Sequence, residues 1–281
     1  MRANRARENR SQGGGGMEIE ALEQVEKLAM KKSGVYRQSR VRYAARSALA
    51  GMFVGIGVIA AFKTGNYFNE AGSPLAYPAA ALTFGAAIVL ISYGGADLFT
   101  GNTFYLAFAA LRKKLGWGEV GKLWAATYAG NALGACALAS LVALAGLFAD
   151  RSASGFLLEV AEHKAAAPVA ELFFRGILCN WLVCLAFFLP MRMRGEGAKM
   201  FAMMLCVFCF FVSGYEHSVA NMAIFAVSLT LDRPETVTAA GALRNLIPVT
   251  LGNVVGGSVF MGVMYYYANK PFLRGEERPK R

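Results

Sequence analysis

Long apolar blocks dominate the pattern of hydrophobic and polar positions along the chain. A helix needs about 20 mostly apolar residues to cross the hydrocarbon core of a bilayer, and six blocks are long enough. The pattern therefore predicts an all-α membrane protein with six transmembrane helices. The predicted spans are residues 43–62, 77–111, 123–148, 169–191, 201–231 and 246–268.

Composition agrees with this class of protein. Hydrophobic residues make up 56% of the chain and charged residues 17%, and the mean hydropathy of +0.40 is too apolar for an ordinary soluble domain. All five cysteines fall inside predicted spans, where a thiol packs as a small apolar group. Cys206 and Cys209 form a CxxC motif without a second pair, which favours packing over redox or zinc chemistry. We therefore expect no metal and no cofactor.

The basic residues predict the topology. Most of the 29 Lys and Arg residues lie before the first span, after the sixth, or in the second-to-third and fourth-to-fifth connections. Cytoplasmic segments of membrane proteins carry this excess, so both termini are expected to be cytoplasmic. The net charge of +11 follows from that topology, and no nucleic-acid partner is expected.

The chain divides into four predicted parts. Residues 1–17 hold an Arg cluster and a run of glycines without apolar residues to bury, which is typical of a disordered basic extension. Within 18–40, apolar residues recur at helical spacing among charged ones, which predicts an amphipathic helix at the cytoplasmic interface. Residues 41–268 form the predicted pore domain, and 269–281 a basic cytoplasmic tail.

The second and fifth spans are interrupted by matching polar motifs. The motif GADLFTGN at 95–102 and the motif GYEHSVAN at 214–221 place glycine, an acid and asparagine at the same offsets. The third and sixth spans each carry GNxxG, at 130–134 and 252–256. Two matching halves of three spans each have opposite orientations in a bilayer, so the sequence predicts an inverted repeat with broken second and fifth helices. Such breaks mark a permeation site near the midplane, because half-helix N-termini present partial positive charge to an anion.

Four segments resemble the signature segments of the formate/nitrite transporter family, and they cover both halves of the chain: GADLFTGNT at 95–103, FFRGILCNWLVCLA at 173–186, SGYEHSVANM at 213–222 and NLIPVTLGNVVGG at 245–257. The resemblance implies an aquaporin-like six-helix protomer and a homopentamer in the lipid bilayer of the bacterial inner membrane. Each protomer would hold a pore for formate, nitrite, hydrosulfide or related small monoacids.

His217 is the main candidate pore residue, because a histidine at membrane depth is a functional hypothesis by default. The alternative is a structural histidine held by a neighbouring carbonyl or hydroxyl. His217 matches the family's central pore histidine, and the resemblance places Thr100 across the pore from it. The hydroxyl of Thr100 would orient the imidazole or meet the substrate, whereas its alternative role is a helix cap.

Further site residues follow from the motifs or the resemblance. Asp97 and Glu216 are expected to cap the broken-helix termini, and with Asn102 and Asn221 to support the breaks. The resemblance implies apolar constrictions on either side of the histidine, at Phe84, Ile88, Leu98, Phe99 and Phe210. Ordinary core packing is the alternative role for these residues, and the two roles are compatible. Ile88 departs from the family's usual leucine but stays apolar.

Three more polar residues have two interpretations each. Lys164 matches a lysine that the family places near the outer vestibule, where it would attract anions; the alternative is a solvated loop lysine. Asn180 and Asn253 either hydrogen-bond the broken segments or line the vestibule. Arg175 is expected to anchor the fourth span at the interface.

The predicted function is a channel or transporter for small monovalent anions. An anion entering an apolar constriction loses many kcal/mol of hydration free energy and its neutral acid far less, so the substrate is expected to cross as the acid or while sharing a proton. The residues of these segments resemble the nitrite branch of the family more closely than the formate branch. Nitrite is therefore the expected substrate, with formate or hydrosulfide as the alternatives. A neutral-solute aquaporin-like channel has the same architecture, but paired Asn-Pro-Ala motifs are absent. We do not expect the protein to be an enzyme, because the sequence contains neither an HExxH motif nor a recognisable pair of nucleophile and base.

Overall fold

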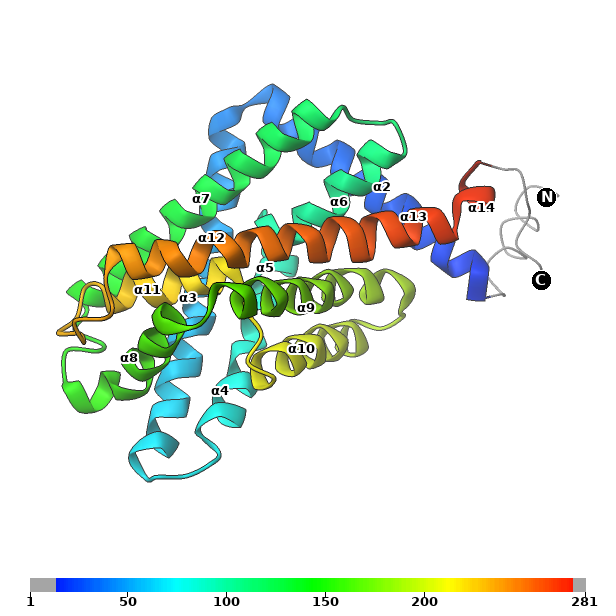
Figure 1. The fold of residues 1–281 in the computed structure, drawn as a ribbon. Coiled ribbons are helices and arrows are strands. Elements are labelled where there is room, and N and C mark those ends of the chain that lie inside the picture. Colours follow the sequence, from blue (N-terminus) through cyan, green and yellow to red (C-terminus); the bar gives the residue numbers. More distant parts are fainter. Residues whose placement is uncertain (1–13, 275–281) are drawn as a thin grey trace.

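The computed structural model of the chain describes residues 14–274, and every regular element in this part is a helix (Figure 1). Residues 1–13 of the predicted extension and 275–281 of the predicted tail lie outside the described residues. The first helix, α2, spans Gly14–Gln38. It begins four residues before the predicted boundary at residue 18.

Each half of the chain contains one long helix, one broken crossing and a second long helix. The first half consists of α3 (Arg40–Glu70), the broken crossing α4 (Ala76–Phe84), α5 (Ala86–Tyr93) and α6 (Phe99–Leu111), and then α7 (Trp117–Leu144). After α8 (Arg151–Ala166), the second half consists of α9 (Val169–Phe188) with η1 (Leu189–Arg192), the broken crossing α10 (Glu196–Val212) and α11 (Ser218–Ser228), and then α12 (Ala239–Val255), η2 (Gly256–Val263) and α13 (Met264–Ala268). The short helix α14 (Lys270–Arg274) follows.

Six membrane crossings result. Within residues 14–274, five helices are long and apolar enough to cross a membrane: Arg40–Glu70, Ala76–Tyr93, Trp117–Leu144, Val169–Arg192 and Ala239–Ala268. The remaining crossing is made of α10, with 17 residues, and α11, with 11, which are each too short alone. The predicted fold, an all-α membrane protein with broken second and fifth helices, is confirmed.

Both helix breaks follow the same local rule. The glycine that opens each motif adopts a left-handed backbone, with φ of 69° at Gly95 and 70° at Gly214, a conformation that side chains with a Cβ rarely adopt. The backbone N–H of Asp97 then donates to Arg46 O at 3.1 Å, and that of Glu216 donates to Arg175 O at 3.3 Å. Each broken segment is therefore hydrogen-bonded to the long helix that opens its own half. The same bond occurs at the equivalent position in both halves of the repeat.

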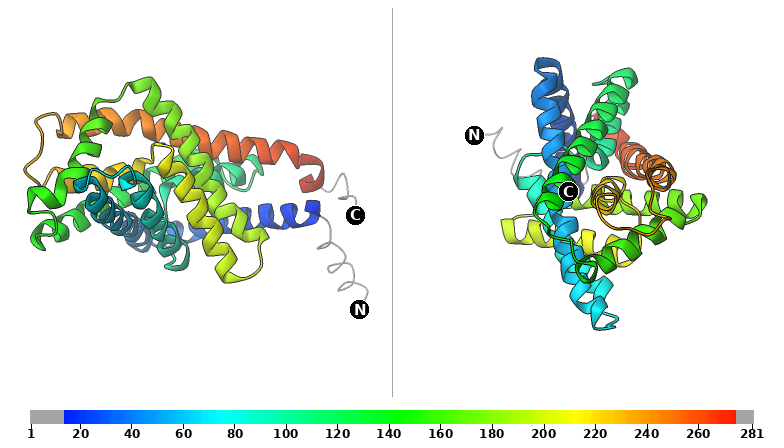
Figure 2. Two further views of the ribbon diagram at one scale, coloured as in Figure 1. Left: turned by 90° about the horizontal axis from the view of Figure 1, so that it is seen from below. Right: turned by 90° about the vertical axis from the view of Figure 1, so that its left-hand side faces the viewer.

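The molecule has two opposite ends, one marked by α2 and the other by α8. In Figure 1 and in the left view of Figure 2, α2 begins where α13 and α14 finish, and α8 lies at the opposite end. We call the first end the α2 face; the connections after α6 and after η1 also lie there, since Arg112 pairs with Glu26 of α2 and Arg192 with Glu18. We call the second end the α8 face. Since α2 precedes the first half and α8 the second, the repeat extends to these two helices.

Glycines of the GNxxG motifs let the long helices touch. A Cβ added at Gly134 of α7 would lie 1.9 Å from Ala48 O of α3, and one at Gly252 of α12 would lie 2.2 Å from Phe173 O of α9. Both obstructing atoms are backbone atoms that no side-chain rotation can move. The same motif therefore brings the two pairs of long helices into contact in both halves.

Replacing Gly134 by alanine is expected to destabilise the protein by about 1–3 kcal/mol, the usual range for overpacking a core. Gly121→Ala in the same helix is the control, because its added methyl group meets nothing within 4 Å; it is expected to stabilise by roughly 0.5–1 kcal/mol. Thermal unfolding in detergent measures both changes. Equal melting temperatures for the two variants would contradict the close helix contact.

Candidate functional site

His217 is buried between the N-termini of the two half-helices. It is the N-cap of α11, and its Nδ1 accepts the backbone N–H of Ala220 at 3.0 Å. Its Nε2 lies 3.0 Å from Oγ1 of Thr100, the second residue of α6. The N-termini of both half-helices thus meet at one imidazole, and Thr100 lies opposite His217. Their partial positive charges favour a negatively charged or strongly polar group there.

The hydrogen bonds of His217 define its tautomer. Because Nδ1 accepts a backbone N–H, the ring hydrogen of the neutral imidazole is on Nε2 and is donated to Thr100 Oγ1. A proton added at Nδ1 would face the N–H of Ala220 and break the cap. This geometry favours the neutral ring, which offers one N–H toward the opposite half-helix.

Two asparagines of the GNxxG motifs hold the breaks in the same way. Asn131 accepts the N–H of Phe99 at 2.9 Å and donates to the carbonyls of Ser47 and Asp97 at 2.7 and 3.0 Å. In the other half, Asn253 accepts the N–H of Ser218 at 2.9 Å and donates to two carbonyls, those of Gly176 and Glu216. Each side chain satisfies two backbone groups that the interruption leaves free and also bonds to a carbonyl of the neighbouring long helix, Ser47 O of α3 or Gly176 O of α9.

Asn180 links the two halves. It is fully buried, and its Nδ2 lies 3.2 Å from Thr100 O, 2.8 Å from Thr103 Oγ1 and 2.5 Å from Asn253 O. Of the two interpretations from the sequence, the structure places Asn180 and Asn253 in hydrogen bonds to the broken segments. Asn131 was not among the site residues predicted from the sequence, although the matching GNxxG motifs contain the signal.

The prediction that Asp97 and Glu216 cap the half-helices is wrong. The N-cap of α6 is Leu98, which makes no side-chain cap bond, and the N-cap of α11 is His217. Each acid precedes its cap residue by one position, and its side chain bonds elsewhere. The acids instead form ion pairs with cations from other helices.

On the α8 face, Lys164 of α8 pairs with Glu216, with Nζ 2.8 Å from Oε1. Only 11% of the lysine side chain is exposed, so the interpretation as a solvated loop lysine is wrong. Burial lowers the pKa of Lys164, but the Glu216 carboxylate more than offsets this, so the pKa lies above its usual range and the ammonium stays charged. The other oxygen of Glu216 accepts from Asn221 at 2.5 Å.

On the α2 face, Lys32 of α2 is the counterpart of Lys164, and it pairs with Asp97. Lys32 was not among the site residues predicted from the sequence. The signal was present, since a lysine precedes each half by a few residues and an acid occupies the same offset in each break. Asn102 differs from Asn221: it donates to Tyr43 and Thr127 rather than to the nearby acid.

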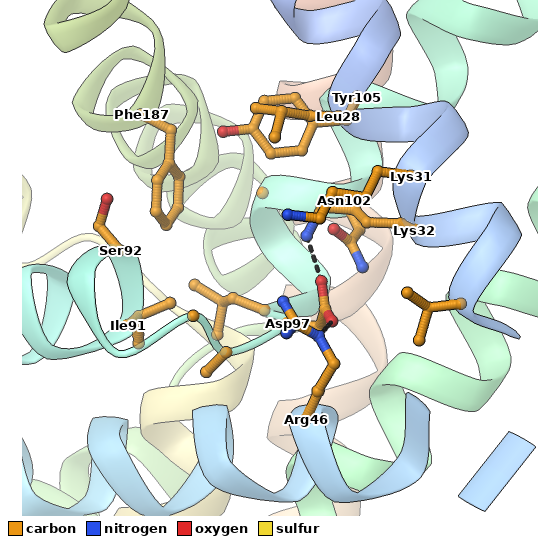
Figure 3. A pocket seen from close by; sticks show the side chains of 15 residues that line it. Leu28, Lys31, Lys32, Arg46, Ile91, Ser92, Asp97, Asn102, Tyr105 and Phe187 are labelled. Atoms are coloured by element: carbon orange, nitrogen blue, oxygen red, sulfur yellow. Dashed lines mark hydrogen bonds and ion pairs between the residues drawn. The ribbon is translucent and has the colours of Figure 1, made fainter. Parts of the chain in front are cut away.

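A cavity of about 210 Å³ opens beside Asp97 on the α2 face. In Figure 3 Lys32 and Arg46, which both line the cavity, approach the Asp97 carboxylate from opposite sides. Leu98 and Ile91 contribute apolar lining, whereas Thr100 and His217 do not line it. The cavity therefore ends before the central imidazole, and Leu98 lies at the transition.

Apolar side chains flank the imidazole, and all five predicted constriction residues are buried. The ring of Phe210 stacks on His217 at 5.9 Å between centroids and 15° between planes. Phe84 contacts Phe210 edge-on at 6.1 Å. Phe99 packs against Tyr128 of α7 instead, and no ring contact joins Phe99 to His217 within residues 14–274. The structure thus brings Phe210 to the histidine and Phe84 to the other ring edge-on.

Comparison with known proteins gives a consistent result. The family described as formate/nitrite transporter matches residues 19–267. The "Uncharacterized transporter YwcJ" of Bacillus subtilis is 59% identical over 90% of this chain and 99% of its own length. The "Nitrite transporter NirC" of Escherichia coli is 41% identical over 79% of this chain and 81% of its own.

Two solved structures share the fold. An "FNT family ion channel" superposes with a TM-score of 0.84 and 35% identity, covering 89% of this chain and 99% of that one. A "Pentameric formate channel with formate bound" superposes with a TM-score of 0.69 and 24% identity over 87% of this chain and 99% of that one.

Proposed function

Since the chain belongs to the formate/nitrite transporter family, we propose that it is a pore for small monovalent anions and their acids, with nitrite as the main substrate. The observation that carries this proposal is the 3.0 Å contact between His217 and Thr100, where two half-helix N-termini meet at membrane depth. The choice of nitrite rests on the name of the Escherichia coli relative, a nitrite transporter. Formate is the alternative, supported by the formate channel of the same fold.

We further propose that five copies assemble in the bacterial inner membrane, each with its own pore and with the α2 face toward the cytoplasm. The pentameric state of the formate channel supports the copy number. The excess of Lys and Arg in the segments of the α2 face supports the orientation. Large apolar side chains exposed along α7, such as Leu133 and Leu141, suit contact with lipid or with another copy.

In this mechanism an anion first reaches the cations at either face: Lys32 and Arg46 at one end, Lys164 at the other. Stripping its water in the apolar neck formed by Phe84, Leu98 and Phe210 costs an anion far more than the neutral acid. The substrate therefore takes up a proton and crosses the neck as the acid. The half-helix N-termini and the Nε2–H of His217 replace part of its hydration at the centre.

The proton comes from hydronium in the solution at the entry face, which becomes water, and the acid returns it to water at the exit face; it does not come from His217. The neutral imidazole already uses Nδ1 as the cap of α11, so His217 acts as a polar contact that a permeating acid passes. Thr100 accepts the Nε2–H in the resting state and releases it when the substrate arrives. Transport, rather than catalysis, is the proposed activity.

Replacing Phe210 by alanine is expected to widen the neck and admit larger monoacids, because exclusion there depends on size and desolvation. We expect lactate flux to rise about tenfold or more relative to formate flux. Phe174→Ala is the matched control, since Phe174 is 61% exposed on α9 and lies outside the site. Proteoliposome flux measures both; an unchanged lactate-to-formate ratio in a folded Phe210 variant would remove this ring from the filter.

Reconstitution tests the function itself. The purified protein in liposomes is expected to release nitrite and formate faster than protein-free vesicles do, with nitrite the faster of the two, and to leave glycerol flux unchanged. Faster formate or hydrosulfide than nitrite would change the substrate but keep the class. Glycerol flux without nitrite or formate flux would favour the neutral-solute alternative, and the proposed function would be wrong.

A further inference from the structure

Two arginines occupy matching positions in the repeat but point to different partners. The backbone carbonyls of Arg46 and Arg175 play the same part, each accepting the N–H of the acid in its break. Their side chains differ. Arg46 donates from Nε to Oδ2 of Asp97 at 2.6 Å, whereas Arg175 turns away from Glu216 and pairs with Glu171 of its own helix at 2.6 Å. The two halves of the repeat therefore differ in ion pairing: the acid of the first break pairs with this arginine, and the acid of the second break does not.

This difference leaves unequal charge at the two acids. On the α8 face Glu216 is matched by one lysine, Lys164. On the α2 face Asp97 meets two cations, Lys32 and Arg46, and Lys31 also lines the cavity there. Among the described residues that line this cavity, three are cations and Asp97 is the sole acid. The cavity carries net positive charge that the Glu216 pair lacks.

The hydrogen-bonding capacity of Arg46 is only partly used. Its Nε bonds to Asp97, and within residues 14–274 its two terminal nitrogens have no hydrogen-bond partner. The side chain is 37% exposed and lines the cavity. The planar guanidinium fork matches two oxygens held by one atom, the geometry of carboxylates, and offers a single-atom anion no such paired bond.

We propose that Arg46 makes the cavity on the α2 face a recognition site for planar monoanions with two oxygens, namely carboxylates and nitrite, and that the α8 face has no equivalent. This rests on the proposed function and adds a selectivity element to it. The pore then binds its substrate unequally at its two ends. Nitrite and formate half-saturate it at lower concentration from the α2 face than from the α8 face, and hydrosulfide, with one heavy atom, shows a smaller difference.

Side-resolved flux tests this proposal. Proteoliposomes carrying a protease-cleavable tag after Arg281 report which face is outward, and half-saturation is measured from each face for nitrite, formate and hydrosulfide. Arg46→Lys keeps the charge and the pairing with Asp97 but removes the fork. We expect it to raise half-saturation for nitrite and formate from the α2 face about five- to tenfold, with hydrosulfide and the α8 face unchanged.

Arg175→Lys is the matched control at the repeat-related position and is expected to leave both faces as in the wild type. Equal half-saturation from both faces in the wild type would overturn the proposal, as would an Arg46→Lys effect of the same size on hydrosulfide, because recognition would then not depend on a pair of oxygens. Failure of the proposed function is distinguishable, because the wild type would then carry none of the three anions from either face. The melting temperature of each variant in detergent separates misfolding from lost recognition.

Discussion

Asn253→Leu is expected to abolish flux and to destabilise the protein. The substitution keeps the branched shape of the side chain but leaves the N–H of Ser218 and the carbonyl of Glu216 without a partner at buried positions, and it removes the bond to the carbonyl of Gly176 inside α9. Each unsatisfied buried group costs about 1–3 kcal/mol, so the expected loss for these two groups is roughly 2–6 kcal/mol. The break would relax, and the N-terminus of α11 would lose its position beside Thr100. We expect a fall in flux of at least about 100-fold.

The control for this variant is Asn269→Leu. Asn269 also makes side-chain hydrogen bonds, to Glu18 and to Tyr265 O, but it lies on the α2 face away from both breaks. Its flux is expected to stay within about twofold of the wild type, since it touches neither half-helix. Melting temperature and proteoliposome flux are measured together. Wild-type flux in Asn253→Leu would show that the break does not need this asparagine.

His217→Asn is expected to reduce flux about 10- to 100-fold while the fold is kept. Asparagine is among the best N-cap residues, so the cap on α11 is retained. The variant loses the Nε2–H that reaches toward Thr100 and the stacking surface for Phe210. A hydrogen bond to the neutral acid contributes about 0.5–1.5 kcal/mol and the lost ring stacking a similar amount, which together correspond to the stated range.

A second variant distinguishes the two roles of the imidazole, the helix cap made by Nδ1 and the contact made by Nε2. His217→Ala removes the cap as well, and is expected to lower the melting temperature in addition to the flux, because losing an N-cap costs about 1 kcal/mol. If His217→Asn carried nitrite and formate at wild-type rates, the imidazole would be a structural cap and not a contact for the substrate.

The sequence predicted the breaks because their cause is local. Glycine, acid and asparagine at equal offsets mark both interruptions, and Gly95 and Gly214 indeed adopt the left-handed backbone that only glycine takes easily. The spans followed from length and apolarity alone. These features depend on neighbouring residues, so one sequence is enough to find them.

The partners of the acids were not predictable in the same way. Asp97 meets Lys32, which is 65 positions earlier in the chain, and this pairing depends on how α2 packs against α6. Asn102 and Asn221 share an offset but not a partner, because Tyr43 and Thr127 offer hydroxyls to the first and Asn245 an amide oxygen to the second. Long-range contacts such as these distinguish the two halves, and a repeat pattern cannot show them.

The dependence of flux on pH tests the central claim, passage of the neutral acid through an apolar neck beside a neutral histidine. Nitrite flux of wild-type proteoliposomes is measured from pH 5 to pH 8, well below half-saturation and with protein-free flux subtracted, first at fixed total nitrite and then at fixed nitrous acid. At fixed total nitrite we expect the flux to fall about tenfold per pH unit. The reason is that the fraction present as nitrous acid falls about tenfold for each pH unit above the pKa of the acid. At fixed nitrous acid we expect a constant flux. A flux that instead changes through a midpoint near 6.5 at fixed nitrous acid, and loses that change in His217→Asn, would contradict the claim and make His217 the proton donor.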